Sequence, residues 1–442
     1  MGEKIFEKFM PVFPSSSSIP PSNFASDSAL AREFFAPLLE ALCAASDQRL
    51  CHGLNDQDWM LLGVRRALED HVSGRGFLQH LVCRGISAPR QSNFFETLKS
   101  ARRLRLTGNV AKALEAMLRV PSGHALSRCT ELEGFDLYAG DGHYHAAASH
   151  DPRHSEDGIK YATGHFFSLN LRTHALAHLA TGDQVSRKIE HDMRALKRME
   201  IDTLRHGAPK GRKVLYVWDR AGIDFRQWYR WKHGSGIYML SRVKDNMKLE
   251  VIGQNPIDTG DPRNQGVLAD EIVATSQGVS VRRITYLCPL SGQVYEFLTN
   301  ADSLPPGLVA HLYRIRWDIE KTFDELKNKL GETKAWASSA NAKTMQAHFL
   351  CLAHNLMVLF EEHLDQTHGV RNEAELKRRN QRLERERVRL AEITQSVPAL
   401  YASLQRITQR SLKFIRWLRV LLFSNPGKGN PIDALRRLFA TL

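Results

Sequence analysis

An amphipathic segment at residues 304–330 constrains the fold of this chain more than any other stretch. It begins with Ser303 as a helix cap and two prolines in the first turn, and it ends in a lysine-rich turn before Gly331. Apolar residues recur at steps of three and four, which places them on one stripe of a helix. They are Leu312, Ile315, Ile319, Phe323, Leu326 and Leu330. We therefore expect one continuous helix that buries this stripe.

A second face of the same segment carries charge. Tyr313, Arg316, Glu320 and Lys327 follow one another at steps of three, four and seven residues, so all four project to one side of a helix. A solvated helix face with ordinary charge pairs would show the same pattern. The alternative is a functional edge, in which one carboxylate is flanked by two cations and a phenol.

Strand-like segments earlier in the chain end at two further acids. Residues 135–141 suggest a strand that ends at Asp141, alternation at 167–171 suggests an antiparallel strand, and residues 174–180 suggest a third. A helix pattern at 189–199 follows, and the apolar run 214–218 ends at Asp219. The order of strands and helices indicates an α/β protein but fits several folds.

The pattern Tyr313, Arg316, Glu320 and Lys327, with Trp317 directly after the arginine, resembles the YREK signature of DDE transposases from bacterial insertion sequences, the insertion-sequence-4-like group. The resemblance implies a ribonuclease-H-like core with Asp141, Asp219 and Glu320 as the catalytic acids. Arg220 follows the second acid as in the family. The glycine after it, Gly222, is displaced by one position.

The same resemblance implies the cofactor and the DNA contacts. Asp141, Asp219 and Glu320 would hold Mg²⁺, with Mn²⁺ as a possible substitute, since hard oxygen ligands suit both ions. Two such ions would activate a water or a 3′-hydroxyl and stabilise the leaving oxygen. The expected DNA contacts are Tyr313, Arg316, Trp317, Lys327 and Arg220. For Trp317, packing in the core is the alternative to stacking on a base.

We expect four regions along the chain. Residues 1–28 form a flexible Pro/Ser-rich arm, and residues 29–125 form a helical DNA-binding domain with a helix-turn-helix-like outline around Gly85. A plain helical bundle with a basic surface is the alternative. Residues 130–364 form the catalytic core, with a β-rich insertion at about 240–302 whose middle, 255–266, is an exposed loop. Residues 365–442 form C-terminal helices.

Composition and charge indicate the partner and the compartment. The net charge of +13 favours a polyanion, and the six cysteines contain no CxxC pair, which fits a reducing cytoplasm. No stretch suggests a signal peptide or a membrane span. By resemblance the partners are double-stranded DNA, as terminal inverted repeats and as target, and a second copy of the chain in a homodimeric DNA complex. We expect a bacterial, nucleoid-associated cytoplasmic protein.

The function this implies is cut-and-paste DNA transposition by metal-dependent cleavage and strand transfer. One alternative is a ribonuclease-H-like nuclease without strand transfer, and another is a domesticated DNA-binding protein. Four histidines near the first acid would allow a zinc site, but no cysteine is near and their spacing is loose. They are His143, His145, His150 and His154, and we expect polar loop residues there.

Overall fold

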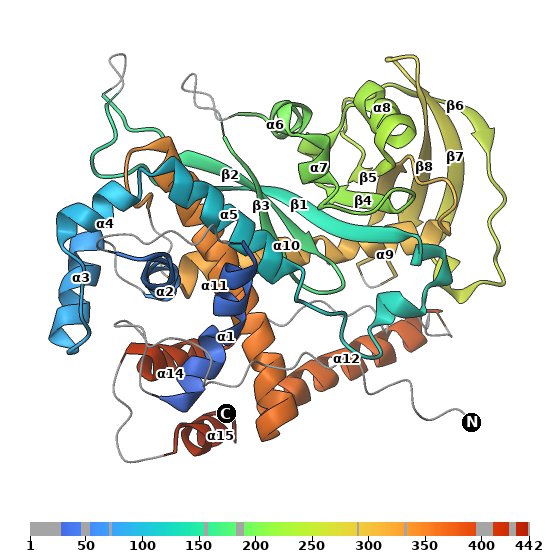
Figure 1. The fold of residues 1–442 in the computed structure, drawn as a ribbon. Helices are drawn as coiled ribbons and strands as arrows, with labels where there is room; N and C mark the ends of the chain where they lie inside the picture. The colour runs from blue at the N-terminus through green and yellow to red at the C-terminus, as the bar shows by residue number, and fades with distance from the viewer. Residues whose placement is uncertain are drawn as a thin grey trace, which may run out of the picture.

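The computed structural model describes residues 28–45, 54–69, 73–153, 158–182, 190–289, 291–330, 334–394, 410–423 and 430–440. The predicted Pro/Ser-rich arm lies outside these residues except for Ser28. Within them the chain is a mixed α/β protein with one large sheet and helices around it (Figure 1).

Nine strands form a single sheet in the order β3-β2-β1-β4-β5-β9-β8-β7-β6. The first five are β1 (Phe135–His145), β2 (Thr163–Asn170), β3 (Leu176–Thr181), β4 (Lys213–Trp218) and β5 (Ile237–Arg242). β1, β2 and β3 pair in antiparallel fashion, whereas β4 lies parallel to both β1 and β5. Buried apolar side chains on both faces of β4 match the prediction of a strand covered on both sides.

The other four strands extend the same sheet. They are β6 (Leu249–Gln254), β7 (Val267–Thr275), β8 (Ser280–Leu287) and β9 (Val294–Thr299), and all pair in antiparallel fashion. The loop at 255–266 is less exposed than predicted, because Asn264 is buried and its side chain accepts a hydrogen bond from the Gly307 N–H at 3.0 Å. A Cβ on Gly307 would lie 1.8 Å from the Arg263 carbonyl oxygen, so only glycine allows this loop to reach the next helix.

Helices cover the sheet and form the regions before and after it. Those before the sheet are α1 (Ala29–Ala45), α2 (Asp56–Leu68), α3 (Gly74–Cys83), α4 (Gln91–Thr97) and α5 (Ala101–Glu115). Those between the strands are α6 (Asp192–Arg198), α7 (Ile201–Leu204) and α8 (Phe225–Ser235). The later helices are α9 (Pro306–Ile315), α10 (Trp317–Asn328), α11 (Ala340–His368), α12 (Glu373–Thr394), α14 (Leu412–Phe423) and α15 (Pro431–Ala440).

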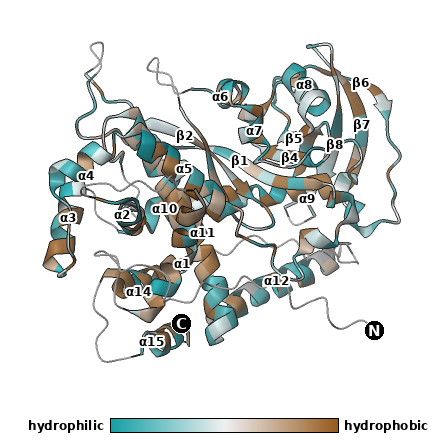
Figure 2. Cartoon of the chain, in the orientation of Figure 1, coloured by the Kyte–Doolittle hydropathy of each residue, from teal (hydrophilic) through white to brown (hydrophobic). Residues whose placement is uncertain are grey.

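α11 is the apolar centre that joins the helical part to the sheet. It packs against β3 on one side and against α1, α2 and α5 on the other. Its buried residues include Phe349, Leu352 and Leu356. Figure 2 shows α11 largely in the hydrophobic colour, whereas the charged α12 carries much of the hydrophilic one. The predicted helix at 340–363 is therefore present and continues to His368.

The predicted single helix at 304–330 is wrong in one respect: it is two helices, α9 and α10, that meet at Arg316. The backbone tightens there, since the Arg316 N–H bonds to the Tyr313 carbonyl and the Ile319 N–H bonds to the Arg316 carbonyl, each three residues apart. The predicted apolar stripe is buried throughout, with Leu312 and Leu326 fully inaccessible. Arg316 itself keeps helical backbone angles, and the break leaves the stripe intact.

The helix-turn-helix-like outline is also altered. Gly85 has φ of 71° and forms the predicted turn, but the second helix is divided into α4 and α5. Ser100 starts α5 by accepting a hydrogen bond from the Arg103 N–H at 3.3 Å. Arg102 binds both oxygens of Asp56, and Arg103 is buried against the same carboxylate. These two cations hold α5 on the start of α2.

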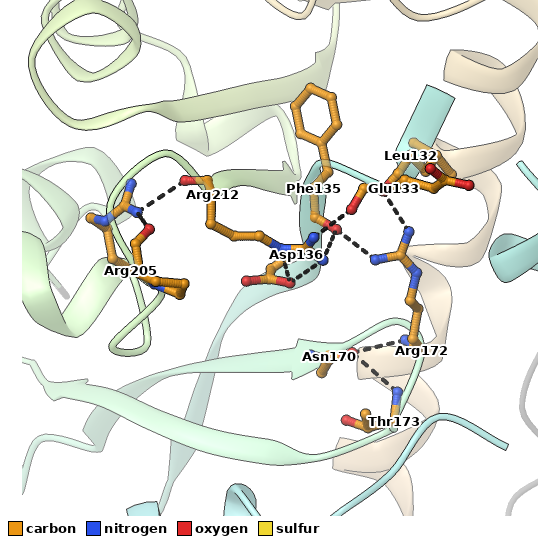
Figure 3. A network of polar contacts seen from close by, with 10 residues as sticks. Leu132, Glu133, Phe135, Asp136, Asn170, Arg172, Thr173, Arg205 and Arg212 are labelled. Carbon is orange, nitrogen blue, oxygen red and sulfur yellow. Dashed lines mark hydrogen bonds and ion pairs between the residues drawn. The ribbon is translucent and has the colours of Figure 1, made fainter. Parts of the chain in front are cut away.

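A polar network fixes the start of β1 (Figure 3). Arg172 donates to the carbonyls of Phe135 and Leu132, and Arg212 donates to the Phe135 carbonyl and to the carboxylate of Asp136. The strand that carries Asp141 is thus anchored at its first residues by two arginines from neighbouring segments.

No helix among the described residues is both long enough and apolar enough to cross a membrane.

Candidate active site

Two of the predicted acids lie side by side where the parallel pairing of β1 and β4 ends. β1 itself continues to His145, so the prediction that this strand ends at Asp141 is wrong. β1 pairs with β4 up to Gly140 opposite Trp218, so Asp141 and Asp219 are the next residues on the two strands. Gly140 is required here, because a Cβ would lie 1.9 Å from the ring of Trp218. The register of the sheet therefore sets the distance between the two carboxylates.

Asp141 lies in an environment that disfavours its charge. Burial raises the pKa of Asp141 to about 7, and the neighbouring Asp219 acts in the same direction, while Arg316 opposes both. Its Oδ1 accepts a hydrogen bond from the Gly142 N–H at 2.8 Å, and its Oδ2 lies 3.4 Å from Nη1 of Arg316. These two contacts orient the carboxylate without fully compensating it.

Asp219 is held by the turn that follows β4. Its Oδ1 accepts a hydrogen bond from the Ala221 N–H at 2.8 Å, and its carbonyl accepts one from the Ser241 hydroxyl at 2.7 Å. The short helix Arg220–Gly222 begins there, so the displaced Gly222 lies inside this turn. The carboxylate is thereby fixed at the end of the strand.

Glu320 on α10 is linked to Asp141 through Arg316. Nη2 of Arg316 donates to Oε1 of Glu320 at 2.6 Å, and Nη1 of the same guanidinium faces Asp141. Arg316 is buried, and it precedes Glu320 by four residues, so the two side chains meet on one face of the helical segment. The structure thus brings Asp141 beside Asp219, and the guanidinium of Arg316 connects Glu320 to Asp141.

The donor set fits a hard divalent cation. All three predicted ligands offer carboxylate oxygens, and carboxylates repel one another unless a cation lies among them. In this structure the guanidinium of Arg316 lies between Asp141 and Glu320, so among the described residues the three acids do not form a closed ligand set. A divalent cation would compete with Arg316 for the same oxygens.

The predicted DNA contacts differ in accessibility. Tyr313 is half-buried, with its ring 5.0 Å from that of Phe297. Trp317 is 47% exposed, so the alternative of a packed core tryptophan is wrong. Lys327 is exposed, and Arg220 lies 3.4 Å from the exposed Asp245. Trp317, Lys327 and Arg220 are therefore accessible to a ligand.

One acid near the site, Asp192, could not be recognised from the sequence. Asp192 begins α6, and its Oδ2 accepts a hydrogen bond from Nε1 of Trp218 at 2.9 Å. Burial raises the pKa of Asp192, and Asp219 adds to the effect. An acid in the first turn of a helix is too common to single out without the fold.

The nearby histidines are not all loop residues. His143 and His145 lie on β1 and are buried, so the loop prediction is wrong for them, whereas His150 is exposed and His154 lies outside the described residues. The ring of His143 stacks on Phe323 of α10 at 4.6 Å. His143 therefore helps to seat the helix that carries Glu320.

Comparison with known proteins supplies independent findings. Residues 139–356 match the family model described as "Transposase DDE domain". The chain is also similar to two curated bacterial proteins whose names call them transposases. One is y4zB of Sinorhizobium fredii (strain NBRC 101917 / NGR234), 26% identical over 150 residues, which are 33% of this chain and 42% of the relative.

The other is the protein of insertion sequence element IS4SA of Synechocystis sp. (strain ATCC 27184 / PCC 6803 / Kazusa). It is 24% identical over 143 residues, which are 32% of this chain and 40% of the relative. The matched part spans about two fifths of the length of both relatives.

Proposed function

We propose a function from the premise that this chain belongs to the transposase DDE domain family through residues 139–356. The protein is a DNA transposase that cuts phosphodiester bonds at the ends of its element and joins the free 3′-hydroxyls to target DNA. One observation carries the proposal: Asp141 and Asp219 lie side by side directly after the parallel pairing of β1 and β4, and Glu320 is linked to Asp141 through Arg316.

The catalytic domain is a ribonuclease-H-like core. Support comes from the strand order β3-β2-β1-β4-β5, with one acid within β1, one directly after β4 and the third on a later helix that packs on β1. We assign the core to residues 130–364 and the insertion to about 240–302, where β6 to β9 lengthen the sheet. Residues 29–125 would form the DNA-binding domain, and residues 365–442 the C-terminal helical region.

Mg²⁺, with Mn²⁺ as a substitute, is the cofactor that suits this donor set, and Asp141, Asp219 and Glu320 would hold it. When bound, the ions would activate the attacking water or hydroxyl and stabilise the leaving oxygen. The Gly142 and Ala221 N–H groups orient the two aspartates beforehand. Arg316 keeps Glu320 directed at Asp141 until the cation binds.

The surrounding side chains would bind the DNA. Lys327 and Arg220 offer cations to phosphates, which fixes the register of the strand but not its sequence. Tyr313 lies at the same edge, and Trp317 offers an exposed ring for stacking on a base. The signature resembles that of the insertion-sequence-4-like group, whose DNA complexes are dimeric, so we propose a homodimer on the terminal inverted repeats. It would act on bacterial DNA in the cytoplasm.

The test is incubation of the purified protein with DNA from both flanks of its own gene, in the presence of Mg²⁺ or Mn²⁺. We expect metal-dependent cuts at matching inverted positions and joining of pre-cut ends to a target plasmid. Glu320→Gln should abolish both. Asp324→Asn on the same helix, an exposed residue that contacts Asn328, is the matched control and should leave both intact.

Any other result of the cleavage and joining assay would contradict the proposal in a specific way. Cleavage without joining would replace the proposal with a ribonuclease-H-like nuclease that lacks strand transfer. DNA binding without cleavage would replace it with a domesticated DNA-binding protein. Equal cleavage by the parent and the Glu320→Gln variant would show that Glu320 is not catalytic.

A further inference from the structure

Far from the acids of the sheet, two histidines and a glutamate meet between the first helix and the end of α11. Nε2 of His363 lies 3.0 Å and Nε2 of His368 lies 3.3 Å from the same oxygen, Oε2 of Glu33. The two imidazole rings are nearly perpendicular, at 87°. All three ligand atoms lie within 4.8 Å of one another.

We propose that Glu33, His363 and His368 form a binding site for a borderline divalent transition-metal ion of the Zn²⁺ type. Two imidazoles and one carboxylate are a donor set that zinc takes in proteins, with a fourth position left to water. Ligands about 2.0–2.1 Å from a tetrahedral ion are separated from each other by about 3.3–3.4 Å. The two nitrogen-to-oxygen distances are near that value, so a small outward shift of the side chains would admit the ion.

The surroundings support a built site. Nδ1 of His363 lies 3.2 Å from the Thr367 hydroxyl, a contact that orients the ring and leaves Nε2 directed at Glu33. The carbonyl of His368 accepts a hydrogen bond from Arg436 of α15 at 2.8 Å, which fixes the end of α11. Gly369 adopts φ of 59° and ends the helix directly after His368.

The exposure of the three side chains allows an ion to enter. His363 is 8% exposed and packs along Phe360, whereas His368 is 27% and Glu33 is 36% exposed. One side of the cluster is therefore open to water, which can supply the fourth ligand. A bound ion would tie α1 to the end of α11, so its role is structural: it joins the first described helix to the apolar centre of the protein.

The alternative is a hydrogen-bonded cluster in which both imidazoles donate to Glu33 and no metal binds. The experiment that separates the two uses the full chain, stripped with a chelator and then kept in excess Mg²⁺. Mg²⁺ occupies sites made of carboxylates, whereas imidazole nitrogen favours Zn²⁺ and Co²⁺. Zn²⁺ is titrated by calorimetry, and Co²⁺ by its visible absorption, which reports imidazole ligation independently of DNA cleavage.

We expect the parent to bind one more Zn²⁺ than the His368→Gln variant, with micromolar or tighter affinity. Glu33→Gln should weaken this site at least about tenfold, as the loss of one of three ligands would. His233→Gln on α8, an exposed histidine elsewhere, is the matched control and should bind like the parent. Zn²⁺ should raise the Tm of the parent and of the control but not that of the two site variants.

Equal Zn²⁺ stoichiometry and affinity in the parent and in both site variants would overturn the proposal, as would no Zn²⁺ binding by the parent. Circular dichroism and Tm in chelator establish that each variant is folded. If His368→Gln does not fold, the partly exposed Glu33→Gln variant decides the question alone.

Discussion

Helix α10 carries two glutamates, Glu320 and Glu325, that lie in opposite electrostatic environments. Glu325 is buried, and its carboxylate accepts hydrogen bonds from the backbone N–H and the guanidinium of Arg410, each at 2.8 Å. Burial alone would raise the pKa of Glu325, but the charge of Arg410 and the nearby His354, whose Nδ1 lies 3.7 Å from Oε1, lower it to about 2. Glu320 instead shares Arg316 with Asp141, and Asp219 adds a further carboxylate.

Under the proposed function, the difference separates a structural charge from a catalytic one. The carboxylate of Glu325 receives hydrogen bonds and a positive charge from Arg410, so it is stable as an anion. Around Asp141 one guanidinium serves two carboxylates, and the pKa of Asp141 is raised to about 7. A fold that concentrates negative charge without compensating it is arranged for a cation that the chain does not itself provide.

The largest effect should come from breaking the compensated cluster. Arg410→Ala leaves Glu325 buried without its main partner and also removes the contact with Glu361 at 2.8 Å. We expect a loss of about 3–5 kcal/mol in the free energy of unfolding, as for other broken buried ion pairs. Urea unfolding followed by tryptophan fluorescence measures it.

Glu320→Gln is the comparison variant. It changes a carboxylate that lies on the same helix as Glu325 but is partly exposed and shares the charge of Arg316 with Asp141. Its free energy of unfolding should lie within about 0.5 kcal/mol of the parent. A loss for Glu320→Gln as large as that for Arg410→Ala would remove the distinction between the two regions.

The second effect is a pH dependence of opposite sign at the two regions. The folded-state pKa of Asp141 is raised from 3.8 to about 7, so its contribution to stability is present below pH 3.8 and is lost as the pH rises through 7. Asp141→Asn should therefore stabilise the metal-free protein at pH 8 by about 1–3 kcal/mol, and by less at pH 5.5. Thermal unfolding at the two pH values, in chelator, measures the difference.

Mg²⁺ sharpens this prediction. Cation binding should raise the Tm of the parent at pH 8 but not that of Asp141→Asn, and so reduce the gap between them. The reverse sign holds for Glu325, whose lowered pKa gives stability above pH 4.5 that is lost only as the pH falls through about 2. A variant without Asp141 that is less stable than the parent at pH 8 would contradict the raised pKa.

The sequence allowed the prediction of features that depend on local periodicity. The buried stripe from Leu312 to Leu330 follows from the helical repeat, and the position of Asp219 follows from an apolar run that ends in an acid. Asp141 lies on the predicted strand, but that strand continues to His145. The assignment of the acids to catalysis rests on the resemblance of a short pattern. It remains a prediction that cleavage assays must test.

Features that depend on contacts distant in sequence were not predictable. Arg316 looked like a phosphate ligand on a helix face, but its guanidinium is buried and faces Asp141, 175 residues earlier. Arg102 and Arg103 lie in the segment expected to form the second helix of the helix-turn-helix-like outline, yet both pair with Asp56. Glu33 lies 330 residues from His363, and the two histidines are five positions apart in the sequence, which places them about 140° apart around a helix.

A smaller effect concerns the exposed ring of Trp317, which lies next to Arg316 in the sequence. Trp317→Ala should leave the Tm unchanged, because the side chain is 47% exposed, but should weaken binding to DNA ends with single-stranded flanks by about tenfold through lost stacking. Tyr229→Ala on α8, whose ring is 53% exposed, is the matched control and should bind normally. Fluorescence anisotropy measures the affinity, and equal weakening in both variants would mean a general loss of exposed aromatic surface.

The smallest effect compares two lysines on α10, of which Lys321 has a carboxylate close to its charge. Lys321 lies 3.5 Å from Asp318, whereas Lys327 is exposed beyond the acids of the site. A lysine that neutralises a DNA phosphate releases a counterion, so its removal lowers the slope of log affinity against log salt by about one. Lys327→Ala should show this change between about 50 and 200 mM salt. Lys321→Ala should not, because its charge is already balanced by Asp318, and a change in the Lys321 variant alone would place the DNA on the other side of the helix.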